Sequence, residues 1–184
     1  MSPGLPWTVL RVPLAIAAIA VCALLVSTPA TSHAGSGCGK IGAVGKRSSH
    51  IKIRDARRAV RCLINAERSA RNLRASDNLH KAAQRHSRYM YKHRCFSHQC
   101  YGEPSTGDRI RSSGYLSGAS SYRYGEVIAL NRDSASPRDI VRQWMHSSSH
   151  RAEIMSSGYR HMGVGMVAAG GHAYYTVTLG WRSG

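Results

Sequence analysis

Three short segments place histidine or glutamate among small polar residues, and these side chains are often used for metal binding and proton transfer. They are "FSH", which ends at His98, "YGE", which ends at Glu126, and "WMHSSSHR", which contains His146 and His150. An imidazole titrates near neutral pH, so it can ligate a metal or exchange a proton, and a carboxylate can do either. Because the chain has 10 histidines, each segment alone is weak evidence.

The segment around His98, "RCFSHQC", allows three chemistries because two cysteines flank the histidine. Cys95, His98 and Cys100 could belong to a zinc site, a cysteine could be a nucleophile with His98 as its base, or a disulfide could close the loop. Structural zinc ligands usually come as two separated pairs, whereas the fourth ligand here, His93, would be crowded into the same turn. A disulfide would remove the thiolate nucleophile. A histidine on a disulfide-closed loop is therefore favoured.

The segment around His150 resembles a zinc-peptidase helix only in its spacing. His146 and His150 are four residues apart, which would place both rings on one face of a helix. Such a peptidase needs a glutamate directly after the first histidine as general base, and the residue there is Ser147. The "GxSxG" pattern of serine hydrolases is also absent from the sequence.

An export signal is predicted at the N-terminus. Residues 14–26 are thirteen consecutive apolar residues, Arg11 precedes them, and a small-residue site, Ser32-His33-Ala34, follows. This pattern predicts a secretory signal peptide over residues 1–34; an uncleaved anchor is the alternative. No later segment approaches a membrane span, so we expect a secreted protein that is soluble outside the cytoplasm.

Four cysteines remain after the predicted signal, and an even number in a secreted chain implies disulfides. They allow three pairings. Cys95 and Cys100 are close enough in sequence to close a small loop by themselves, and Cys38 would then pair with Cys62 by exclusion.

The elements that must position these residues are helices first and strands last. A Gly- and Ser-rich arm covers residues 35–52, and a domain follows over residues 53–184. Apolar periodicity predicts helices that begin near Ile53, at a cap on Ser76 or Asp77, and at Ser136-Pro137, with a short helix near 108–111. A strand is predicted within 120–130 and a hairpin around Gly170-Gly171. This order favours an α+β sandwich.

The charge is strongly positive: 26 Lys and Arg face 9 Asp and Glu, a net charge of +17. Only Arg11 precedes residue 35, so +16 remains on the mature chain. Such a charge favours anionic partners: an acidic polysaccharide, teichoic acid or phospholipid surface, or nucleic acid. Export argues against nucleic acid, and no basic strand interleaved with aromatic residues is present.

Six motifs in this order resemble the bacterial branch of the CAP superfamily, the cysteine-rich secretory, antigen 5 and pathogenesis-related proteins, also called the SCP domain. The motifs are "CLINAERSARNLRASDNLHKAAQRHSRYMYKHRCFSHQC", "GDRIRSSGY", "YGEVIA", "QWMHSSSHRAEIM", "RHMGVGMV" and "YYTVTLGW", and they cover about residues 58–181. The resemblance implies a three-layer α-β-α sandwich with a central antiparallel sheet. It also implies a cleft where His98, Glu126 and His150 converge, and where a divalent metal such as Zn²⁺ could bind.

The sequence departs from the family pattern near that cleft. Ser147 stands where animal members usually carry a second glutamate, Val127 replaces the usual asparagine after Glu126, and Ser148-Ser149 replaces a Pro-Gly. His146 and Ser147 are secondary cleft candidates. We expect a monomeric, non-enzymatic binding module of the cell envelope or extracellular space, with an anionic envelope polymer or lipid as its partner. The alternative is a metal-dependent hydrolase that uses Glu126 as general base.

Overall fold

The computed structural model describes residues 36–184; the predicted signal peptide, including Cys22, lies outside the described residues. Two 3₁₀ turns, Ser36–Cys38 and Ser48–His50, precede the main elements. These are α1 (Ile53–Glu67), β1 (Arg74–Ala75), α2 (Asp77–His93), α3 (Thr106–Ser112), β2 (Tyr122–Arg132), α4 (Pro137–Met145), α5 (Ser148–Met155), β3 (His161–Ala169) and β4 (His172–Arg182).

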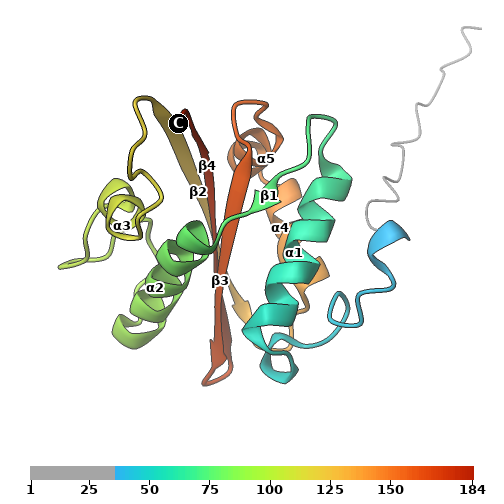
Figure 1. The fold of residues 1–184 in the computed structure, drawn as a ribbon. Helices are drawn as coiled ribbons and strands as arrows, with labels where there is room; N and C mark the ends of the chain where they lie inside the picture. Colours follow the sequence, from blue (N-terminus) through green and yellow to red (C-terminus); the bar gives the residue numbers. More distant parts are fainter. Residues whose placement is uncertain (1–35) are drawn as a thin grey trace, which may run out of the picture. The chain divides into compact units, whose positions relative to one another are not determined.

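A four-stranded sheet with the order β1-β3-β4-β2 forms the middle layer. Helices α2 and α3 lie on one side of it, and α1, α4 and α5 lie on the other (Figure 1). The α-β-α sandwich is thus confirmed. The sheet is antiparallel except at the two residues of β1, which pair parallel to β3. The main core lies between the sheet and α1 with α4, and two smaller apolar clusters lie under α2 and α3.

The predicted helix starts are confirmed at their caps. Ser76 caps α2 by accepting a hydrogen bond from the N–H of Leu79. Ser136 and Asp139 form a reciprocal capping box at the start of α4, with Pro137 in the first helical position. The hairpin between β3 and β4 turns at Gly170-Gly171, as predicted, and both glycines have positive φ.

Helix α2 packs unusually close to β3. A Cβ added to Gly163 would lie 2.0 Å from the carbonyl carbon of Leu79, and one added to Gly165 would lie 2.3 Å from the carbonyl oxygen of Ala83. Only glycine allows this approach of helix backbone to strand backbone. The same face of α2 carries His86, so the approach also sets how deep that side chain lies.

The N-terminal arm is packed on the main core. Cys38 forms a disulfide with Cys62 of α1, and the buried Val44 accepts a hydrogen bond from the backbone of Arg138. The hydroxyl of Ser48 lies 2.8 Å from the hydroxyl of the buried Tyr175 on β4. The arm is thus connected to both α1 and the sheet.

None of the helices within residues 36–184 has the length and apolar character that crossing a bilayer requires.

We expect the stability of the protein to decrease as the solution becomes acidic, because three buried or half-buried imidazoles resist protonation in the folded state. Burial, the largest cause in each case, lowers the pKa of His80, His150 and His161 below the ordinary value near 6.5. The unfolded chain therefore takes up these protons at a higher pH than the folded protein does, and the free energy of unfolding falls as pH drops below about 6.5. Urea unfolding at pH 7.5 and pH 5.5 measures the effect.

The control is His80→Asn, because an amide can replace the hydrogen bonds that the ring nitrogen Nδ1 of His80 makes with the backbone of Val164. This variant should show a weaker dependence on pH than the wild type. Equal stability of the wild type at the two pH values would contradict the prediction.

Candidate functional site

Glu126 lies in the middle of β2, an edge strand of the sheet, and its side chain points toward α2 and α3. Only 4% of that side chain is exposed. One guanidinium nitrogen of Arg109, Nη2, lies 3.0 Å from each carboxylate oxygen, and Nδ1 of His98 lies 3.1 Å from Oε1. The hydroxyl of Thr106 also contacts Oε1, at 3.4 Å. The carboxylate is thus buried, ion-paired and hydrogen-bonded.

Arg109 connects the parts of this site. It lies in α3, which Ser105 caps, and only 4% of its side chain is exposed. Besides Glu126, its guanidinium donates to the carbonyls of Pro104 and His98, each at 2.9 Å. The guanidinium therefore fixes the backbone of the loop that carries His98 as well as the charge of Glu126.

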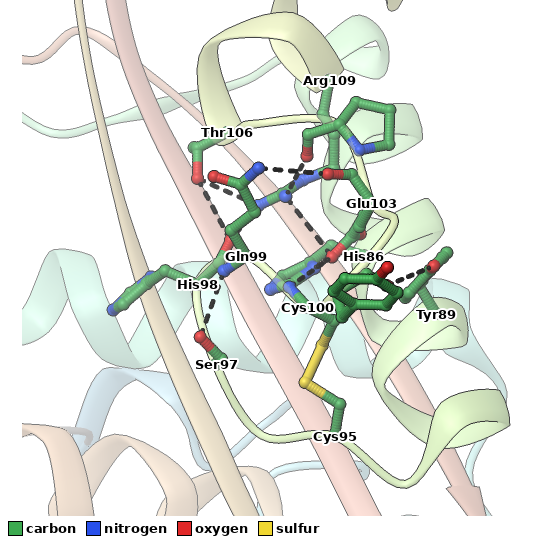
Figure 2. Close-up of a disulfide and its surroundings, with 12 residues drawn as sticks. His86, Tyr89, Cys95, Ser97, His98, Gln99, Cys100, Glu103, Thr106 and Arg109 are labelled. Carbon is green, nitrogen blue, oxygen red and sulfur yellow. Dashed lines mark hydrogen bonds and ion pairs between the residues drawn. A yellow bond between two sulfur atoms is a disulfide. The ribbon is translucent and has the colours of Figure 1, made fainter.

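A second buried carboxylate, Glu103, pairs with His86 of α2. Nδ1 of His86 lies 2.8 Å from Oε1 of Glu103, and neither side chain is more than 2% exposed. Nε2 of His86 lies 3.7 Å from Glu126 and has no hydrogen-bond partner among the described residues. Nη1 of Arg109 is 3.6 Å from Glu103. Figure 2 shows His86, Glu103 and Arg109 gathered on one side of the loop.

The loop between α2 and α3 is closed by the Cys95–Cys100 disulfide, as predicted (Figure 2). The backbone N–H of Cys100 donates to Glu103 at 3.3 Å, and the side chain of Gln99 donates to the carbonyl of Glu103 at 3.2 Å. His98 lies between the cysteines, and 53% of its side chain is exposed. We call Glu126, Arg109, His98, His86, Glu103 and Thr106 the Glu126 cluster.

Opposing effects set the protonation of this site. Burial alone would raise the pKa of Glu126, but the hydrogen bond from His98 and the positive charges of Arg109 and His86 outweigh it, so the pKa lies below its ordinary value. His150, on α5, has its pKa lowered by burial and, to a smaller extent, by the charge of His98. No hydrogen bond joins the two imidazoles among the described residues, and the buried Nδ1 of His150 has no hydrogen-bond partner there.

Known proteins share this combination of sequence and fold. The sequence profile of "CAP: Cysteine-rich secretory protein family" matches residues 51–180, most of the chain. The chain belongs to the CAP family.

The CAP domain has bacterial relatives. A Bacillus subtilis protein described as "Uncharacterized protein YkwD" is 35% identical over 114 residues, which are 59% of this chain and 41% of the relative. Two solved structures share the fold: an extracellular protein containing a SCP domain from Bacillus anthracis and an outer surface protein from Borrelia burgdorferi. Their TM-scores are 0.58 and 0.62, at 21% and 17% identity. The matches cover 70% and 72% of this chain, and 43% and 97% of the two structures.

The secondary candidates of this CAP domain, His146 and Ser147, form the junction between α4 and α5. Helix α4 ends at Met145, so His146 is the residue that follows it, whereas His150 lies in the separate helix α5. The exposed ring of His146 lies 2.8 Å from the carbonyl of Arg142, and the hydroxyl of Ser147 lies 3.2 Å from that of Ser149. Neither makes a hydrogen bond or ion pair with the Glu126 cluster within residues 36–184.

A metal centre of three protein ligands does not fit the arrangement of this CAP domain. No group of three or more His, Cys, Asp or Glu side chains within residues 36–184 is placed to hold a metal ion. Both oxygens of Glu126 face the guanidinium of Arg109, which already supplies a positive charge at 3.0 Å. His98 and His150 would remain as ligands, so metal binding stays a prediction that rests on two imidazoles.

Four residues of the Glu126 cluster were missed by the sequence-based prediction: His86, Glu103, Thr106 and Arg109. His86 falls on the apolar stripe of α2 with Leu79 and Met90, and a histidine on such a stripe is a usable signal. Arg109 and Glu103 carry no comparable local signal, because a charged residue in a short helix or loop is usually exposed.

Proposed function

We propose that this CAP protein is a secreted, non-enzymatic binding module of the cell envelope or extracellular space, and that it takes an anionic polymer at a cleft between His98 and His150. The support comes from the family, from the described locations of the two structural neighbours and from the net charge of +17. An anionic ligand suits a site in which the exposed imidazole of His98 and the half-buried imidazole of His150 can donate hydrogen bonds and the carboxylate is already neutralised.

The observation that carries this proposal is the pairing of Glu126 with Arg109. A general base has to be free to accept a proton, and its pKa should lie near the working pH. Glu126 is held by a guanidinium and by His98, its side chain is almost fully buried, and its pKa is lowered. These properties favour a structural carboxylate that orients His98 over one that activates water.

The exposed backbone of β2 adds a second contact surface. The Glu126 side chain is buried although the residue as a whole is partly exposed, so its backbone accounts for that exposure. β2 is an edge strand, and the exposed backbone at Glu126 is available to a ligand. The carbonyls of Tyr124 and Ile128 are not, because they accept hydrogen bonds from the side chains of Tyr159 and Trp144. Hydrogen bonds to the backbone would give affinity, whereas the two imidazoles would select an anionic group.

Sedimentation with Gram-positive cell walls tests the proposal, with walls stripped of teichoic acid and amylose as the neutral comparisons. We expect His98→Ala and His150→Ala each to weaken binding to intact walls about tenfold, the loss of one charge-assisted contact. His146→Ala is the matched control, since that ring lies outside the Glu126 cluster, and it should change binding less than twofold. Binding should also fall at about 0.5 M salt, where charges are screened.

The same assay with EDTA and with added Zn²⁺ tests whether binding to cell walls depends on a metal ion. We expect a modest response to Zn²⁺, because Glu126 is committed to Arg109. Loss of all binding in EDTA that returns with Zn²⁺ would instead make the metal essential. Equal effects of the three histidine substitutions, or undiminished binding to amylose at high salt, would contradict the proposed cleft.

A further inference from the structure

A groove between α2 and α3 lies next to the Glu126 cluster and has a different chemical character. Its cavity is about 330 Å³, within the lower range for small-molecule sites. One wall consists of α2 side chains, and Pro104 and Ser112 line the other. Glu103 and Arg109 also border it, so the groove and the Glu126 cluster share one boundary.

Three cations of α2 face this groove. Arg85, Arg88 and Lys92 are spaced at i, i+3 and i+7, which places them on one face of the helix. All three are exposed, and none forms a salt bridge with a carboxylate among residues 36–184. The only carboxylate that lines the groove, Glu103, is buried and already pairs with His86 and Arg109. The groove is therefore positively charged without a counter-ion from the described protein.

An aromatic wall accompanies these charges. The ring of Tyr89 stacks on His93 with a centroid distance of 4.1 Å, and its hydroxyl donates to the carbonyl of Tyr101 at 2.9 Å. Figure 2 shows Tyr89 reaching the loop that the Cys95–Cys100 disulfide closes. The ring is thus held in place before any ligand arrives, which reduces the entropy lost on binding.

We propose that the groove binds a phosphate monoester of an apolar alcohol. A phosphate monoester carries close to two negative charges at neutral pH and three strong acceptor oxygens, which match the three unpaired cations. The apolar group lies against Tyr89 and Pro104, where it covers the aromatic ring. This ligand differs from a polymer at the His98–His150 cleft, and its site does not depend on that cleft.

Phenyl phosphate is the probe, titrated into the protein by calorimetry and followed by amide NMR shifts. We expect one saturable site, with the largest shifts in residues 85–93 and 104–112. Inorganic phosphate should bind at least several-fold more weakly because it lacks the ring, and benzyl alcohol should not bind measurably because it lacks the charge. The substitution Tyr89→Leu should reduce the affinity for phenyl phosphate toward that of inorganic phosphate.

The charge test uses two double variants that each remove two positive charges. Arg85→Gln/Arg88→Gln should weaken phenyl phosphate binding by tenfold or more, as expected for lost charge-assisted hydrogen bonds. Arg71→Gln/Arg132→Gln removes two exposed cations outside the groove and should change the affinity less than twofold. Equal weakening by the two variants would show that net charge alone attracts the ligand and would overturn the proposal. Shifts centred on His98 and His150 would overturn it as well.

Discussion

Replacing Arg109 by methionine should destabilise the fold by about 3–5 kcal/mol, the usual cost of removing one partner from a buried ion pair. The substitution keeps an unbranched apolar stem but removes the only guanidinium that forms ion pairs with two buried carboxylates, Glu103 and Glu126, among the described residues. It also leaves the carbonyls of Pro104 and His98 without their donor. The loop that carries His98 would therefore lose two hydrogen bonds to its backbone, and the two carboxylates would lose their positively charged partner.

Urea unfolding at pH 7 measures this effect, and Arg111→Met is the matched control. Arg111 lies on the same helix but is 61% exposed, and its pair with Asp108 is a surface salt bridge worth at most about 1 kcal/mol. Unfolding at low pH distinguishes the loss of charge from the loss of packing. When the carboxylates are protonated, the free energies of unfolding of Arg109→Met and the wild type should lie closer together. If Arg109→Met lowered the free energy of unfolding by less than about 1 kcal/mol, the ion pair between Arg109 and Glu126 would not be a major source of stability.

Replacing Gly163 by alanine should destabilise the protein by roughly 3 kcal/mol or more, at the upper end for overpacked cores. The new methyl would lie 2.0 Å from the backbone carbon of Leu79 and 2.2 Å from the backbone nitrogen of His80, so neither a rotamer change nor a small side-chain shift relieves the clash. Helix α2 would have to move away from β3, which would displace His86 from Glu103 and from the neighbourhood of Glu126.

Gly45→Ala is the comparison, because a Cβ at Gly45 meets no atom within 4 Å and its φ is not positive. It should change stability by less than about 0.5 kcal/mol. Thermal unfolding of both variants by circular dichroism gives the comparison. If Gly163→Ala retained wild-type stability, α2 would have to sit farther from the sheet than the structure places it.

Much of the fold could be predicted because its signals are local. Ser136-Pro137 marks a helix start, because serine caps the helix and proline has a fixed φ. Gly170-Gly171 marks a hairpin turn, because both glycines take positive φ. Each can be recognised from two residues. β1 has no such signal: Arg74 and Ala75 form a strand only because β3 lies beside them. The close packing at Gly163 was likewise hidden, since a glycine in a strand does not reveal which backbone approaches it.

The site was predictable only in part, for a related reason. His98 and Glu126 were identified from a family resemblance, and they are in contact in the structure at 3.1 Å. Arg109 was not identified, because whether an arginine is buried depends on the two carboxylates that the tertiary structure brings to it. The spacing of His146 and His150 was a weak guide for the same reason, because α4 ends at Met145 and His150 lies in the separate helix α5.

The packing of the N-terminal arm bears on where this domain can be cut. The family match begins at residue 51, yet Cys38, Val44 and Ser48 are buried against α1, α4 and β4. A chain trimmed to the match would leave Cys62 with an unpaired thiol and the hydroxyl of Tyr175 with no partner in the core. The minimal autonomous unit therefore extends well upstream of the residues by which the family is recognised. A proteolytic cut near residue 50 would separate part of the core from the main chain, and only the Cys38–Cys62 disulfide would keep it attached.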